Sequence, residues 1–88
     1  MNKQGQLSRK EDKNMDNRII DVNENLTVYL IKRHIDVVLC QNIQTGEYIV
    51  WYSPLVKLEF YYGFYTFSLE QAIRDFKRRA MISDNTEI

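Results

Sequence analysis

The chain has 88 residues, and its 12 Lys and Arg are balanced by 12 Asp and Glu, so the formal net charge is zero. This length leaves room for one small domain, and a neutral chain lacks the long-range field of a dedicated duplex-DNA binder. A single cysteine excludes an internal disulfide, and no apolar run approaches the roughly 20 residues that cross a bilayer. These features predict a cytoplasmic protein that does not enter a membrane.

The N-terminal segment is poor in large apolar side chains, with only Leu7 and Met15 after the first residue. Such a segment cannot bury enough apolar surface to offset the entropy that it would lose on ordering. We therefore predict a disordered N-terminal arm over 1–18, a single domain over 19–82 and a frayed tail over 83–88.

After the arm, β-branched and aromatic residues dominate the sequence. They predict strands over 27–31 and 35–40, or one long bent strand over 27–41. In the second segment apolar residues recur at every other position, and side chains two positions apart share one face of a strand. The face that we expect to point toward the core consists of Ile35, Val37 and Leu39.

The clearest turn signal is the segment Asn42-Ile43-Gln44-Thr45-Gly46-Glu47. The Asn42 side chain can start a turn, and Gly46 can adopt the left-handed conformation that ends it. This segment therefore predicts a hairpin between 35–42 and 47–52.

The strand over 47–52 is apolar on both faces, which predicts a central place in the sheet. Ser53-Pro54 should end this strand, because proline has no N–H to donate to a neighbouring strand. The residues 57–62 then predict a further strand, and Gly63 indicates a bulge or a sharp bend within the aromatic run.

A helix is predicted over 68–81, because Ser68 and Gln71 have the spacing of a capping box. Two i,i+4 ion pairs should support this helix, Glu70 with Arg74 and Asp75 with Arg79. Its apolar face consists of Leu69, Ala72, Ile73, Phe76 and Ala80. The sequence thus predicts an α+β fold, in which a three- or four-stranded antiparallel sheet is packed by one C-terminal amphipathic helix.

No combination of residues points to catalysis. One Cys and one His cannot build a structural zinc site. His34 and Cys40 lie about 20 Å apart along a straight strand, too far for a nucleophile and its base. We therefore predict a non-enzymatic protein without catalytic residues, metal or cofactor, with Cys40 as a small buried thiol and His34 as an edge or turn residue. Catalysis by an unrecognised motif is retained only as a third hypothesis.

Nine aromatic residues lie between positions 48 and 67, more than one face of a small sheet can hide. Since a single helix covers one face only, one of two aromatic sets should stay exposed. The first set consists of Tyr48, Tyr52 and Tyr61, and the second consists of Trp51, Phe60 and Tyr62. We predict that the tyrosine set is the exposed one.

An exposed tyrosine patch favours a protein-binding function, through a partner protein or through a homodimer. The alternative is single-stranded nucleic-acid binding, in which tyrosines stack on bases and basic side chains contact phosphates. Zero net charge favours the protein-binding hypothesis. The candidate binding residues for both are Tyr48, Tyr52, Tyr61, Arg74, Lys77 and Arg78.

Three features carry a resemblance that spans residues 19–80. They are the Asn-x-x-Thr-Gly-Glu turn at 42–47, the aromatic strand and the segment FSLEQAIRDFKRR at 67–79. In this order of features the chain resembles small uncharacterised proteins of Gram-positive bacteria and of their phages and mobile elements. The resemblance implies an accessory protein of such an element that acts by binding a host protein.

Overall fold

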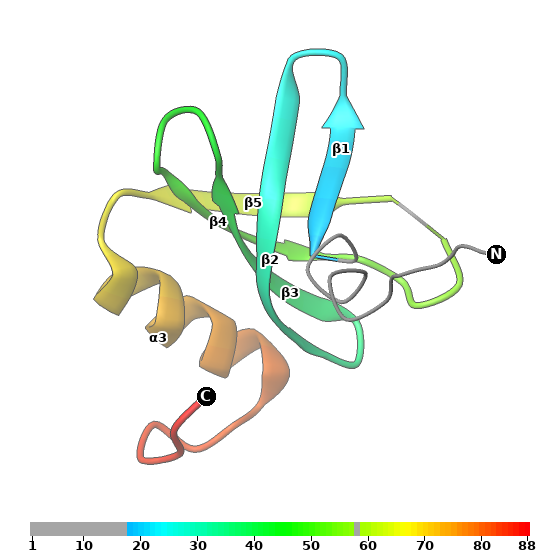
Figure 1. Cartoon of the computed structure of the whole chain (residues 1–88). Coiled ribbons are helices and arrows are strands. Elements are labelled where there is room, and N and C mark those ends of the chain that lie inside the picture. The colour runs from blue at the N-terminus through cyan, green and yellow to red at the C-terminus, as the bar shows by residue number, and fades with distance from the viewer. Residues whose placement is uncertain (1–17, 58) are drawn as a thin grey trace, which may run out of the picture.

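The computed structural model describes residues 18–57 and 59–88, and Figure 1 shows a sheet with one helix packed against it. Five antiparallel strands lie side by side in the order in which they occur in the sequence. The elements are β1 (Ile19–Asn23), β2 (Leu26–His34), β3 (Val37–Asn42), β4 (Tyr48–Tyr52), β5 (Tyr61–Thr66) and α3 (Leu69–Ala80). The α+β class is confirmed, but the sheet has five strands rather than three or four. The predicted arm over 1–18 lies outside the described residues except for Arg18.

The strand that the sequence did not predict is β1. Its polar residues Asp21 and Asn23 lower the β-propensity of the segment, so its conformation depends on its pairing with β2. The Arg18 backbone carbonyl accepts a hydrogen bond of 2.7 Å from the N–H of Leu30. The Arg18 guanidinium donates to the carbonyls of Leu30 and Ile31 over 3.1 and 3.3 Å. The start of β1 is thereby fixed to its neighbour.

The segment 27–41 forms two strands, β2 and β3, rather than one bent strand. Because His34 pairs with Val37, only two residues make the turn between the strands, and the first of them, Ile35, has a positive φ of 53°. The prediction that Ile35 faces the core is therefore wrong, and its side chain is exposed. Val37 and Leu39 point to the core as predicted.

The β3–β4 hairpin confirms its predicted turn. The Asn42 side chain accepts hydrogen bonds from the N–H groups of Gln44 and Thr45, over 2.8 and 3.2 Å. Gly46 has the left-handed φ of 83°, and its N–H donates to the carbonyl of Asn42 over 2.8 Å.

The strand predicted over 57–62 is displaced toward the C-terminus, since β5 begins at Tyr61. Lys57 lies in a turn closed by a 3.3 Å hydrogen bond from its N–H to the carbonyl of Pro54. Phe60 then folds onto the Trp51 ring, with 4.7 Å between the ring centroids, instead of joining a strand. Leu58 lies outside the described residues.

A bulge interrupts β5 at Tyr62 and Gly63, where two residues face the single residue Trp51 of β4, as the glycine indicated. A Cβ atom on Gly63 would lie 2.6 Å from Nε1 of Trp51 and 2.7 Å from Cε1 of Tyr65. Only glycine therefore lets the Trp51 and Tyr65 rings close over this part of the strand.

The helix α3 covers one face of the sheet at β3, β4 and β5 (Figure 1). Ser68 caps it by accepting a 3.2 Å hydrogen bond from the N–H of Gln71, which confirms the predicted start. Leu69 is an exception to the predicted apolar face, because it is 43% exposed. The buried residues of this helix-side cluster are Val37, Leu39, Val50, Ala72 and Phe76.

The opposite face of the sheet is also buried. Its cluster consists of Val28, Val38, Cys40, Ile49 and Trp51, and it is covered in part by apolar side chains of β1 and β2 and by Phe60. A register shift in β2 between Leu30 and Lys32 bends this strand. In Figure 1 the β1–β2 hairpin crosses β4 and β5 instead of continuing in their plane. The sheet thus curls over its own second face, and the premise that the helix leaves one face open is wrong.

Candidate functional site

The structure brings together two of the three predicted tyrosines. Tyr52 and Tyr61 are directly paired across β4 and β5, and they are 37% and 43% exposed. Tyr48 lies at the other end of β4, about 13 Å away at the usual rise of a strand, and packs against the helix-side cluster. The three tyrosines therefore do not form one open face, because α3 lies on the face that carries Tyr48.

The second aromatic set is also divided. Trp51 is only 4% exposed and Phe60 packs beside it, whereas Tyr62 is 81% exposed. The Tyr62 ring lies edge-on to the Tyr52 ring, with 6.4 Å between the centroids. Exposed aromatic side chains from both predicted sets thus meet at one end of β4.

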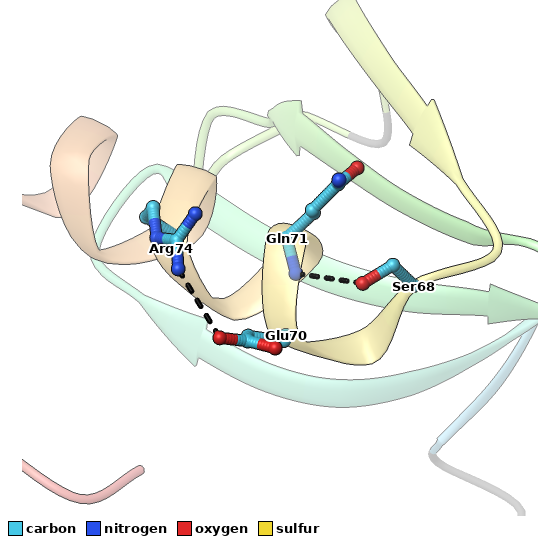
Figure 2. A network of polar contacts seen from close by, with 4 residues as sticks. All are labelled: Ser68, Glu70, Gln71 and Arg74. Atoms are coloured by element: carbon cyan, nitrogen blue, oxygen red, sulfur yellow. Dashed lines mark hydrogen bonds and ion pairs between the residues drawn. The ribbon is translucent and has the colours of Figure 1, made fainter.

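The predicted basic residues are close to one another on α3, but each has an oxygen partner. Figure 2 shows Arg74 in its predicted i,i+4 pair with Glu70, at 3.2 Å. Lys77 is largely buried, and its ammonium group donates to the backbone carbonyl of Asp84 over 3.0 Å. Arg78 pairs with the Asp75 carboxylate. Glu70 thus offsets the charge of Arg74, whereas Arg78 shares the Asp75 carboxylate with Arg79 and the partner of Lys77 is a neutral carbonyl.

A hollow of about 270 Å³ lies between the β2–β3 turn, the end of β4 and the end of α3. Its lining includes Ile35, Tyr52 and Met81, together with Arg79 and the two residues that flank Ile35. The Arg79 guanidinium carbon lies over the Tyr52 ring, 4.9 Å from its centroid. The apolar rim of the hollow continues through Tyr62 and Tyr61, as the contacts of Tyr52 show. We call this region the Tyr52 surface and define it by Ile35, Tyr52, Tyr61, Tyr62 and Met81.

The backbone holds three of these side chains outward. Among the described residues other than glycine, those with a positive φ are Ile35, Tyr62 and Met81, at 53°, 58° and 59°. The same three side chains are 63%, 81% and 92% exposed. A left-handed backbone conformation raises the free energy of a non-glycine residue by about 1–3 kcal/mol, most clearly for a β-branched residue such as Ile35. Such conformations are concentrated at functional sites.

Arg79 is fixed in place by the second predicted ion pair. Its Nε atom lies 2.8 Å from Oδ2 of Asp75, and both side chains are about nine-tenths buried. This pair fixes the guanidinium that lies over the Tyr52 ring, and both Arg79 and Tyr52 line the hollow. The sequence predicted the pair but not its position beneath the Tyr52 ring, because that position depends on how α3 packs against β4.

Two groups near the sheet have altered acidity. The pKa of the Tyr61 hydroxyl is raised, mainly because it donates a hydrogen bond to the Glu59 carboxylate. Burial raises the pKa of the Cys40 thiol to about 12, against a smaller opposing effect of the Arg33 charge. Cys40 is fully buried as predicted, and its thiol is not a nucleophile at neutral pH.

We expect Cys40 to react with iodoacetamide at pH 8 at least about 1,000-fold more slowly in the native chain than in urea. A pKa near 12 instead of 9.0 lowers the thiolate fraction by that factor, since each pKa unit is tenfold, and burial blocks the reagent further. Mass spectrometry of timed samples measures the rate. Labelling of the native chain at the rate of the unfolded chain would contradict the burial of this residue.

Within the described ranges, no group of three or more His, Cys, Asp or Glu is placed to hold a metal ion. No helix in the same ranges is long and apolar enough to cross a membrane. Comparison with protein-family models found no match to this chain, and comparisons with curated proteins and with solved structures found none either.

Proposed function

We propose that the chain is a non-enzymatic protein-binding module whose binding site is the Tyr52 surface. The observation that carries this proposal is the meeting of five exposed apolar side chains from β2–β3, β4, β5 and the end of α3. Separate exposed apolar residues are common on proteins, but a contiguous group with polar neighbours is typical of an interaction site.

The composition and size of the Tyr52 surface support a protein partner. Tyrosine, methionine and arginine are enriched in protein interfaces, and here three tyrosines lie beside Met81 and Arg79. At about 200 Å² for a fully exposed large side chain, the exposed fractions of the five residues amount to roughly 600 Å². This is near the upper limit of about 600 Å² for the largest apolar patch of an ordinary monomer.

Single-stranded nucleic-acid binding has less support. A base-stacking surface needs aromatic rings next to uncompensated positive charge. Tyr48 packs against the helix-side cluster. Arg74 and Arg78 are paired with the carboxylates of Glu70 and Asp75, and Lys77 is largely buried and donates to the backbone carbonyl of Asp84. Two described cations touch the Tyr52 surface. Arg79 is paired with Asp75 and mostly buried. Arg33 donates to the backbone carbonyls of Ile35 and Ser53 over 2.9 and 2.8 Å.

A capture experiment with matched variants tests the proposal. The immobilised chain is exposed to an extract of cells that produce it, and the retained proteins are compared between wild type, Tyr62→Glu and Ile43→Glu. Ile43 is also an exposed apolar residue, but it lies at the β3–β4 turn, at the opposite end of these strands from Tyr52. We expect Tyr62→Glu to weaken retention by about 30-fold or more, as for a residue that contributes about 2 kcal/mol, and Ile43→Glu to leave it unchanged.

Retention that is equal for Tyr62→Glu and wild type would contradict a site at this surface. Fluorescence anisotropy with labelled single-stranded RNA and DNA tests the alternative in parallel. We expect no binding at tens of micromolar protein. Binding that weakens with salt and is lost in Tyr52→Ala would instead support nucleic-acid recognition.

A further inference from the structure

We infer that the partner of the Tyr52 surface is a second copy of this chain, bound face to face across a twofold axis. This inference rests on the proposed function and names the protein that the surface binds. A twofold interface uses the same patch on both copies, so the patch must be complementary to itself in charge and shape. The turn between β2 and β3 meets the charge requirement.

The β2–β3 turn carries His34, Ile35 and Asp36 in succession, and all three line the hollow of the Tyr52 surface. Within the ranges 18–57 and 59–88, no hydrogen bond or ion pair involves the side chain of His34 or of Asp36. The exposed apolar residue Ile35 is thus flanked by a hydrogen-bond donor, His34, and by an acidic acceptor, Asp36. When Ile35 lies near a twofold axis, His34 of each copy faces Asp36 of the other, and both pairs form at once.

The rest of the Tyr52 surface also favours contact with itself. Its five defining residues are Ile35, Met81 and three tyrosines, and the charged groups that contact them are of both signs. Arg33 donates to the Ile35 carbonyl, Glu59 accepts from the Tyr61 hydroxyl, and Arg79 lies over the Tyr52 ring. The surface therefore lacks the excess of charge of one sign that usually opposes self-association.

The exposed area is close to what a stable dimer requires. A standard interface buries about 800 Å² on each partner, and the five apolar side chains supply roughly 600 Å² of this. His34, Asp36 and the backbone of the β2–β3 turn contribute further area at the rim. Interfaces of the standard size have dissociation constants from micromolar to picomolar, set by the quality of their contacts rather than by area.

Analytical ultracentrifugation of the purified full chain tests the dimer. For a chain of 10.6 kDa we expect a species of about 21 kDa, twice that mass, at 200 µM, and dissociation on dilution. The double variant Tyr62→Glu/Met81→Glu should be monomeric at 200 µM, while Ile43→Glu should dimerise like wild type. Circular dichroism and thermal unfolding verify that each variant is folded.

A charge exchange distinguishes a twofold dimer from other modes of association. His34→Glu places two acidic groups opposite each other, and Asp36→Lys places a lysine opposite a histidine. We expect each single variant to raise the dissociation constant at least about tenfold, because the change occurs twice in the interface. The double variant His34→Glu/Asp36→Lys should restore it to within about threefold of wild type.

A wild-type chain that is monomeric at 200 µM would overturn the inference. If capture by the immobilised chain still depends on Tyr62 in that case, the proposed function stands with a different protein as the partner. If neither dimerisation nor capture depends on Tyr62, both proposals fail. A dimer that survives Tyr62→Glu/Met81→Glu, or charge variants whose effects merely add, would place the interface elsewhere and also overturn the inference.

Discussion

Replacement of Phe76 by alanine is expected to lower the free energy of unfolding by about 3–5 kcal/mol. The Phe76 ring is fully buried between α3 and the sheet, where it packs with Leu39 and Val50. Its removal leaves a cavity that the strands cannot fill without breaking their pairing. Since small domains have only about 5–15 kcal/mol of stability in total, this loss should be evident as a large shift of the urea midpoint.

Leu69→Ala is the matched control on the same helix. Leu69 belongs to the same apolar helical pattern as Phe76, but it lies in the first turn and its side chain is 43% exposed. We expect this change to cost less than about 1 kcal/mol. Urea titrations followed by circular dichroism and by Trp51 fluorescence measure both variants. Equal effects of the two changes would contradict the packing of α3 on the sheet.

Replacement of Trp51 by alanine should lower the free energy of unfolding about as much as replacement of Phe76, by roughly 3–5 kcal/mol. Trp51 lies on the face of the sheet away from α3, so its loss tests the second cluster independently of the helix. Its ring packs against Phe60 and edge-on against Tyr65, with 6.2 Å between the centroids of the latter pair. If the sheet did not curl over this face, Trp51 would be exposed and its removal nearly neutral.

Tyr62→Ala provides the control for this prediction. Tyr62 is an aromatic residue of the adjacent strand, but it is exposed on the Tyr52 surface. We expect its removal to change stability by less than about 1 kcal/mol while it disrupts binding. Circular dichroism in urea compares the two variants. A loss of several kcal/mol from Tyr62→Ala would show that this residue belongs to the core.

The parts of the fold that the sequence predicted are those with local causes. Asn42 and Gly46 determine their turn by hydrogen bonding and backbone freedom within a few residues. Ser68 determines the start of α3 by a cap to Gln71, and the helical spacing of Ala72, Phe76 and Ala80 determines which face packs. Signals of this kind need no knowledge of distant residues.

The errors arose where tertiary contacts decide the structure. Alternation placed Ile35 in a strand, but the pairing of His34 with Val37 makes it a turn residue. The aromatic character of 57–62 predicted a strand, but Phe60 packs on Trp51 and leaves the sheet. The curl of β1 and β2 depends on a bulge in β2 that no local signal indicated.

The candidate site was predicted in part for the same reason. Tyr52 and Tyr61 lie together because the strand register pairs them, and the sequence pattern placed both among the candidates. Ile35 and Met81 join them only because the end of α3 lies next to the β2–β3 turn. Their outward positions follow from left-handed backbone conformations, which neither residue type favours and which the sequence therefore did not reveal.

The order of the strands has a consequence for synthesis on the ribosome. Each strand pairs with the one made just before it, so hairpins form between near neighbours and folding is expected to be fast. The packing around Trp51 needs residues up to Tyr65, whereas the cluster around Leu39 also needs Phe76. One side of the nascent sheet is thus complete while the other is still bare and apolar. The emergence of α3 ends this stage, and until then a chaperone or a neighbouring nascent chain has access to the uncovered face.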